Sequence, residues 1–207
     1  KVVVPRWFFR MWYGEAASFL ASGQNVRPTR LLEAGFRFAK PTIEDFFEGT
    51  DHAAVDRLDL HRYMGTWYEI ARFDHRFERG LSEVTATYTL MPDGTVRVEN
   101  RGCKHKKPYD VCKTAEGRAK IPDPSQPGKL KVSFFLSFYS DYYVLELDQD
   151  EYNYALIGSS SDKYLWILSR VPILPEEIKK KLLDAATRRG YDVKKLIWVE
   201  QREKKIM

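Results

Sequence analysis

The chain has 207 residues and 43% hydrophobic content, enough for one good-sized domain, or for one domain with an appendage. Its net charge of +5 is scattered among acidic residues, so the sequence offers no basic stripe for nucleic acid and at most a weak attraction to anionic lipids or ligands. No apolar run approaches the length of a membrane-spanning helix, and no signal peptide opens the sequence.

The first part of the chain, residues 1–49, predicts a helical extension. Apolar residues recur at helical spacing until Gly23, and Pro28 and Pro41 each open a further short helix. The segment is too small to bury its aromatic residues alone, so we expect it to pack on the rest or to be a remnant of another domain. Position 1 is Lys, so we interpret the chain as a processed or cut piece of a longer protein.

Residues 50–59 are interpreted as a linker, and from Leu60 onward the hydrophobic period becomes two. The stretch SEVTATYTL, Ser82 to Leu90, alternates as a half-buried strand does, and MPDGT behind it supplies an Asp-Gly hairpin turn. Six similar stretches follow, each bounded by turn residues. With the stretch that opens at Leu60, they predict an all-β fold, an eight-stranded antiparallel up-and-down barrel that closes to hide its edges.

A single helix is predicted behind the barrel in LPEEIKKKLLDAATRRG. Pro175 and two glutamates suit its first turn, and Gly190 suits its end. The stretch DVKKLIWVE then predicts a last short strand, and residues 201–207 form a tail.

Several motifs in the same order resemble the lipocalin family, and in particular its branch with the bacterial outer-membrane lipocalin and apolipoprotein D. They are Gly65-Thr66-Trp67-Tyr68-Glu69, DEYNYALI and YLWILSR ahead of one helix, over about residues 60–200. The resemblance implies that Trp67 fills the barrel floor and that Arg170 lays its guanidinium across the indole. It also implies that Gly65 lets the incoming chain pass close by. These three roles are structural and not catalytic.

By parity with this family, alternate strand residues face the barrel interior and form the candidate ligand-binding wall. An eight-stranded barrel holds one small ligand, and each buried methylene stabilises such a complex by about 0.8 kcal/mol. The alternative is that these faces, over part of each strand, pack outward under the C-terminal helix. A one-residue error in the register would exchange every assignment. The wall residues are Val84, Ala86, Tyr88, Val96, Val98, Asn100, Val132, Phe134, Tyr164, Trp166 and Leu168.

The family resemblance implies one hydrophobic small molecule or lipid as partner, with a fatty-acyl tail in the calyx and its polar end at the mouth, for storage, transport or envelope lipid maintenance. The mouth loops are expected to include FDHRFERGL and FYSDYY. Arg72, Arg76 and Arg79 are candidates to meet a carboxylate or phosphate head group; the alternative is that at least two of them are solvated. Glu69 shares the parity of Trp67 and is expected to be a buried, hydrogen-bonded carboxylate near the floor.

Residues 1–49 resemble a different family: they are similar to the C-terminal tail of NAD-dependent, epimerase-like short-chain dehydrogenases. The motifs that carry this resemblance are GE and SGQ-V-P-RLLEAGF-F-PT. The nucleotide-binding half is absent, so no NAD binding or enzyme activity is expected. The alternative function is a lipocalin module that serves a fused epimerase-like enzyme as a substrate-binding or docking domain. No lipobox cysteine stands between Gly49 and Leu60, which favours a cytoplasmic location, with the periplasm or outer membrane as alternative.

The two cysteines, Cys103 and Cys112, flank KHKKPYDV near the end of a predicted hairpin. A disulfide there would add about 2–3 kcal/mol of stability, and two free thiols in a reducing compartment are the alternative. Their position off the barrel wall argues against thiol catalysis.

The four histidines are dispersed, so no metal or cofactor site is expected, and His75 is interpreted as solvated or capping rather than as a haem ligand. The third class of function is an interaction module. Its docking face would be the N-terminal aromatic segment, which would form a homodimer. The residues of this segment are Trp7, Phe8, Trp12, Phe46 and Phe47.

Overall fold

The structure is a computed structural model, and the residues described are Glu33 and residues 49–105, 109–135 and 138–202. The chain divides into two compact units, Lys1–Phe47 and Glu48–Met207. The helices and the homodimer predicted for the N-terminal segment therefore lie outside the described residues, as does most of the tail. The second unit is described below.

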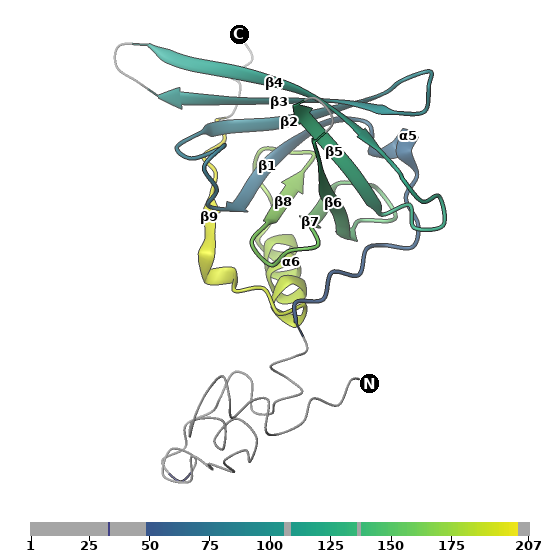
Figure 1. The fold of residues 1–207 in the computed structure, drawn as a ribbon. Helices are drawn as coiled ribbons and strands as arrows, with labels where there is room; N and C mark the ends of the chain where they lie inside the picture. The colour runs from purple at the N-terminus through teal and green to yellow at the C-terminus, as the bar shows by residue number, and fades with distance from the viewer. Residues whose placement is uncertain (1–32, 34–48, 106–108, 136–137, 203–207) are drawn as a thin grey trace, which may run out of the picture. The chain divides into compact units, whose positions relative to one another are not determined.

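Eight strands of the second unit form a closed antiparallel barrel (Figure 1), which confirms the predicted fold class. Each strand pairs with the next along the chain, and the first strand pairs with both the second and the eighth, so the eight strands close on themselves. The last short strand predicted from DVKKLIWVE is present as β9 (Leu196–Trp198), and the structure pairs it with β1. The barrel strands are β1 (Gly65–Phe73), β2 (Ser82–Leu90), β3 (Val96–His105), β4 (Asp110–Lys120), β5 (Lys129–Phe135), β6 (Phe138–Leu147), β7 (Tyr154–Gly158) and β8 (Leu165–Ser169).

The predicted bounds of β2 are those of the structure, but one predicted loop is a strand. FYSDYY was expected at the mouth as a loop, whereas Phe138–Tyr143 is the first half of β6 and pairs with β5. Ser140 stands opposite Val132, and Asp141 opposite Lys131. These two short polar residues are therefore consecutive positions of a paired strand, with side chains on opposite faces, rather than turn residues.

One long helix, α6 (Glu176–Arg188), covers the outside of the barrel beside β7 and β8 (Figure 1). It buries Leu182, Ala185 and Ala186, the core of the predicted apolar stripe. Leu182 and Ala186 belong to an outer core with the outward residues of the wall, Leu145, Leu156, Leu165 and Ile167 among them. Among the described residues of the second unit, two short helices remain, α5 (Leu60–Tyr63) before the barrel and η1 (Val193–Lys195) behind α6. None of the helices in the described part of the chain is long and apolar enough to cross a membrane.

The segment 50–59 was interpreted as a linker, but in the structure it is packed on the barrel. The backbone N–H of Val55 donates to the carbonyl of Val144 at 2.8 Å, and that of Asp51 to Arg189 at 2.8 Å. Val55 and Leu58 pack against the inner core of the barrel. The few apolar residues of this polar stretch thus give it a fixed position, which composition alone did not indicate.

Candidate ligand-binding calyx

Trp67 and Arg170 close one end of the barrel. Trp67 is fully buried, and its indole Nε1 donates to the carbonyl of Tyr63 at 2.9 Å. The guanidinium carbon of Arg170 lies 3.9 Å from the centre of the indole, a cation–π contact. Gly65 has a φ of +93°, and a Cβ there would lie 3.4 Å from Arg170 Nη1. A glycine therefore suits this backbone conformation, in which the chain runs close to the guanidinium of Arg170. The guanidinium also donates to the backbone carbonyls of Arg62, Tyr63, Met64, Thr66 and Tyr152.

The structure brings most of the predicted wall residues together in the inner core of the barrel. Four of them are buried there and three more are half-buried against it. Because these residues alternate with outward ones on each strand, the register is that expected from parity. The four are Tyr88, Val96, Val98 and Leu168, and the three are Ala86, Val132 and Trp166.

The other four predicted wall residues lie farther from the floor or at the edge of this core. Val84 is buried against Gly102 of β3, and the ring of Tyr164 stacks on Trp166 with centres 5.8 Å apart. Phe134 is 43% exposed, and Asn100 has a buried Oδ1 with no hydrogen-bond partner.

The end of the barrel opposite the floor carries exposed aromatic side chains. Phe134, Phe138 and Tyr164 are 43%, 75% and 37% exposed, and Phe77 in the loop between β1 and β2 is 73% exposed. The ring of Phe134 lies over Gly117 of β4, where a Cβ would come within 2.7 Å of it. Strand β5 pairs with β4 only from Arg118 to Lys120, so the remaining length of β4 is paired on one side, with β3.

Three tyrosines form a hydrogen-bonded group within the barrel. The hydroxyl of Tyr142 lies 2.6 Å from that of Tyr63 and 2.9 Å from that of Tyr88. Burial raises the pKa of all three, so they stay neutral over the physiological range. Tyr63 and Tyr142 were missed from the sequence, although Tyr142 has the parity of the buried Val144.

Glu69 and Arg72 form a buried hydrogen-bonded pair inside the barrel, in which Arg72 Nη1 donates to Glu69 Oε1 at 2.6 Å. Arg72 is 2% exposed and also donates to the backbone carbonyls of Glu78 and Leu81, at 2.6 and 3.3 Å. Strand β1 has an irregularity between Glu69 and Ala71 where it pairs with β8. This bulge turns Arg72 to the same side as Glu69, a position that strict alternation does not predict.

Glu78, in the β1–β2 loop (residues 74–81), extends this polar group toward the mouth. Its Oε2 lies 2.8 Å from His75 Nε2 and accepts a hydrogen bond from Trp166 Nε1 at 3.2 Å. His75 was expected to be solvated or capping, and this was wrong. Its side chain is 14% exposed, and its ring lies against those of Tyr164 and Trp166, with centres 6.0 and 5.3 Å away.

The two carboxyl groups of this cluster have opposite pKa shifts. Burial, and then the charge of Glu78, raise the pKa of Glu69 to about 8, against the opposing influence of Arg72. Burial also acts to raise the pKa of Glu78, but hydrogen bonds and charges from His75, Trp166 and Arg72 outweigh it and lower that pKa. Near neutral pH, Glu69 is therefore the protonated member and Glu78 the ionised one.

The three candidate mouth arginines have different environments. Arg72 is inside the barrel, as described, whereas Arg79 pairs with the exposed Asp74 at 2.8 Å. Arg76 is exposed, and its guanidinium lies over the ring of Phe77, 4.7 Å from the ring centre. Two of the three are thus surface arginines, and only Arg72 lies within the calyx.

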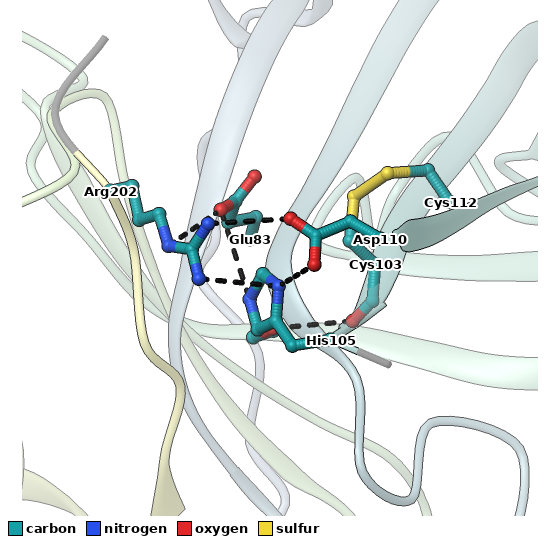
Figure 2. Close-up of a disulfide and its surroundings, with 7 residues drawn as sticks. Glu83, Cys103, His105, Asp110, Cys112 and Arg202 are labelled. Atoms are coloured by element: carbon teal, nitrogen blue, oxygen red, sulfur yellow. Dashed lines mark hydrogen bonds and ion pairs between the residues drawn. A yellow bond between two sulfur atoms is a disulfide. The ribbon is translucent and has the colours of Figure 1, made fainter. Parts of the chain in front are cut away.

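The two cysteines are joined in a disulfide between directly opposite positions of β3 and β4, with their Cα atoms 3.9 Å apart. Figure 2 shows a charged group beside it that links the C-terminal segment to β2 and β4. Arg202 lies 3.3 Å from both Glu83 and Asp110, and His105 lies 2.8 Å from Asp110.

Within the described ranges, no three His, Cys, Asp or Glu side chains are grouped to hold a metal ion.

A hollow of about 520 Å³ lies at the closed end of the barrel, near the β6–β7 turn. Its lining mixes two arginines with two aspartates, so it has no single ligand chemistry. The lining residues are Arg57, Leu58, Asp59, Arg62, Gln149, Asp150 and Tyr152.

A closed eight-stranded barrel with a plugged floor and an apolar inner core is the architecture of a class of small-molecule-binding proteins. Residues 58–201 match the model of the lipocalin-like domain family, so the chain belongs to the lipocalin family. Residues 4–49, which resemble the epimerase-like tail, match a second family, described as a domain of unknown function (DUF1731).

Relatives of known name agree with this membership. The chain is 50% identical over 147 residues to the outer membrane lipoprotein Blc of Escherichia coli (strain K12), which covers 71% of the chain and 81% of that protein. It is 34% identical over 154 residues to apolipoprotein D of Mus musculus, with 70% and 78% covered. The solved structure of insecticyanin from Manduca sexta is similar with a TM-score of 0.60 and 23% identity, over 75% of this chain and 87% of that one, which shows the fold alone.

Proposed function

We propose that the chain binds one hydrophobic or amphipathic molecule with a fatty-acyl tail in the calyx. The observation that carries this proposal is the difference between the two ends of the barrel. One end is plugged by Trp67 and Arg170, and the other has exposed aromatic side chains. The apolar inner face between them offers burial to a long alkyl chain at about 0.8 kcal/mol per methylene. On this proposal the chain is a binding protein for lipid storage, transport or envelope lipid maintenance, and not an enzyme.

A role in the bacterial envelope is supported by two observations. The similar proteins from Escherichia coli and Citrobacter freundii are named outer membrane lipoproteins. The bonded pair Cys103 and Cys112 is typical of an oxidising compartment, because cytosolic thiols are kept reduced. Both favour the periplasm or outer membrane over the cytoplasmic location expected from the N-terminal segment.

The test is the presence of a ligand and its displacement from the calyx. Organic extraction of the purified chain, followed by mass spectrometry, is expected to release a lipid, and the extracted chain is expected to bind oleate. Ala86→Trp puts an indole into the inner core and should weaken oleate binding about tenfold or more. Thr85→Trp, one position away on the outward face, is the matched control. Equal effects of the two substitutions, or no oleate binding by the native chain, would contradict the proposal.

A second candidate function is a lipocalin module that acts as the substrate-binding or docking domain of a fused epimerase-like enzyme. It is favoured by the two family matches on separate segments, which coincide with the two compact units. The coding sequence upstream of residue 1 provides the test. A reading frame in phase that encodes a strand followed by a Gly-rich dinucleotide turn would support this function, and a lipobox there would contradict it.

A further inference from the structure

The carboxylate of Glu78 is held inside the mouth of the barrel by groups from three elements. Arg72 comes from β1, Trp166 from β8, and His75 from the same loop as Glu78. Trp166 stands opposite Arg72 in the β1–β8 pairing, so the two side chains are neighbours on the inner face. Their distances to Glu78 Oε2 are 3.2 Å from Trp166 Nε1, 2.8 Å from His75 Nε2 and 3.9 Å from Arg72 Nε.

These groups offer more hydrogen-bond capacity than one carboxylate oxygen uses. The three contacts all converge on Oε2 of Glu78. Arg72 Nε and both ring nitrogens of His75 are buried without a hydrogen-bond partner, although His75 Nε2 lies 2.8 Å from Glu78 Oε2. A buried cationic donor without a partner is costly, so an acceptor with further oxygens at this point would be favoured.

The second carboxyl group next to Arg72 does not fill this role. Glu69 contacts Nη1 of Arg72, whereas the groups of Glu78 lie at its Nε and Nη2. Burial raises the pKa of Glu69 to about 8, so near neutral pH this residue contributes a neutral acid. The positive charge of Arg72 is therefore balanced chiefly by Glu78, a residue of the loop rather than of the barrel wall.

We propose that Arg72, His75 and Trp166 form a binding site for the anionic head group of a single-chain amphiphile, and that Glu78 occupies this site when no ligand is bound. The head group is an oxyacid, a carboxylate or a phosphate monoester. This inference rests on the proposed function, because the tail of the same molecule lies in the calyx. The head group replaces the Glu78 carboxylate, and the β1–β2 loop moves outward as it does so.

The direction of the tail follows from the neighbours of the site. Leu168, two residues beyond Trp166 on β8, stands opposite Glu69 and belongs to the inner core. Tyr164, two residues before Trp166, stacks on it and is 37% exposed. An alkyl chain attached to a head group at Arg72 thus has the apolar core on one side and the exposed aromatics of the mouth on the other. The core side buries more of it, so the tail runs toward Trp67.

The experiment compares three amphiphiles of equal chain length: hexadecanoate, hexadecyl phosphate and hexadecanol. Dissociation constants are measured from tryptophan fluorescence on the full chain after organic extraction. Glu78→Gln keeps the shape of the side chain but removes the competing charge. It should strengthen the binding of both anions about tenfold, and that of hexadecanol less than about twofold.

Asp74→Asn is the matched control, because it removes one negative charge from the same loop at an exposed residue paired with Arg79. It should leave all three affinities within about twofold of the native values. Trp166→Phe keeps an aromatic ring but loses the Nε1 donor, and should weaken anion binding without weakening hexadecanol binding. Arg72→Gln should abolish the preference for anions; if that variant does not fold, Trp166→Phe and Glu78→Gln still decide the outcome.

The possible results separate the two proposals. If hexadecanol binds but Glu78→Gln gives no selective gain for the anions, or Asp74→Asn gives the same gain, the head-group site is wrong and the calyx proposal stands. A gain for the carboxylate alone, or for the phosphate alone, supports the site and identifies its ligand class. If none of the three binds, the proposed function fails and the head-group site fails with it.

Discussion

Arg170 lies flat against Trp67, with its guanidinium carbon 3.9 Å from the centre of the indole. The same guanidinium donates to the carbonyls of Arg62 and Met64, both at 2.8 Å, and so holds the segment that crosses the floor. One side chain therefore joins the end of β8, the start of β1 and the short helix α5. The floor depends on the planar fork of arginine, which a lysine cannot reproduce.

Arg170→Lys is expected to lower the free energy of unfolding by about 2–3 kcal/mol, through lost carbonyl hydrogen bonds and a weaker contact with Trp67. Urea denaturation followed by circular dichroism measures this difference. Arg188→Lys, at an exposed position of α6, is the control and should change stability by less than about 0.5 kcal/mol. Equal stability of the two variants would show that the floor does not rely on the guanidinium.

Glu69→Gln is expected to change how stability depends on pH. The folded-state pKa of Glu69 is raised to about 8 from a usual value of 4.5, so between these values the folded chain holds a proton that the unfolded chain has lost. The free energy of unfolding should therefore fall as pH rises through this window. The charges that act on the pKa of Glu69 are those of Glu78, which raises it, and Arg72, which lowers it, and Glu69 in turn raises the pKa of Tyr88.

The amide that Glu69→Gln introduces does not titrate, so this part of the pH dependence is lost in the variant. Urea denaturation at several pH values from about 5 to about 9 tests this point, with the native chain beside the variant. The variant should gain stability relative to the native chain as pH increases. A difference between the two chains that stays constant over the whole range would contradict the raised pKa.

Much of the barrel could be predicted because burial on one face imposes a period of two. SEVTATYTL gave the bounds of β2 correctly, and the GTW motif with Arg170 gave the two partners of the floor. The residues that bear chemistry were harder to predict, because they depend on departures from alternation. Arg72 faces inward only after the bulge at Glu69–Ala71, and no local sequence signal distinguishes it from the exposed Arg76 and Arg79.

The contact between Glu78 and the barrel wall depends on tertiary structure. Its loop reads as polar and solvated, and only the folded chain brings it to Trp166, 88 residues away in sequence. The same limit applies to Val55, whose hydrogen bond to Val144 joins a supposed linker to the barrel. Sequence patterns indicate which face of a strand is apolar, but not which distant backbone or charge will meet it.

Gly117→Ala is expected to destabilise the wall at Phe134. A Cβ at Gly117 would lie 2.7 Å from both Phe134 Cδ1 and the carbonyl of Ser133, so ring and backbone would have to move. The cost should be about 1–3 kcal/mol in urea denaturation. Gly49→Ala is the control, since a Cβ there meets nothing within 4 Å. Combining Gly117→Ala with Phe134→Ala should recover part of the loss, and strict additivity of the two would contradict the contact.

The disulfide between Cys103 and Cys112 is expected to stabilise the hairpin of β3 and β4. It closes a loop with a sequence separation of 9, for which the loss of unfolded-state entropy corresponds to about 2–3 kcal/mol. The double variant Cys103→Ala, Cys112→Ala should lose about this much stability relative to the oxidised chain. Thiol titration of the unfolded protein, without reductant, should find no free thiol in the native chain. Finding two would contradict the bond and with it the preference for an oxidising compartment.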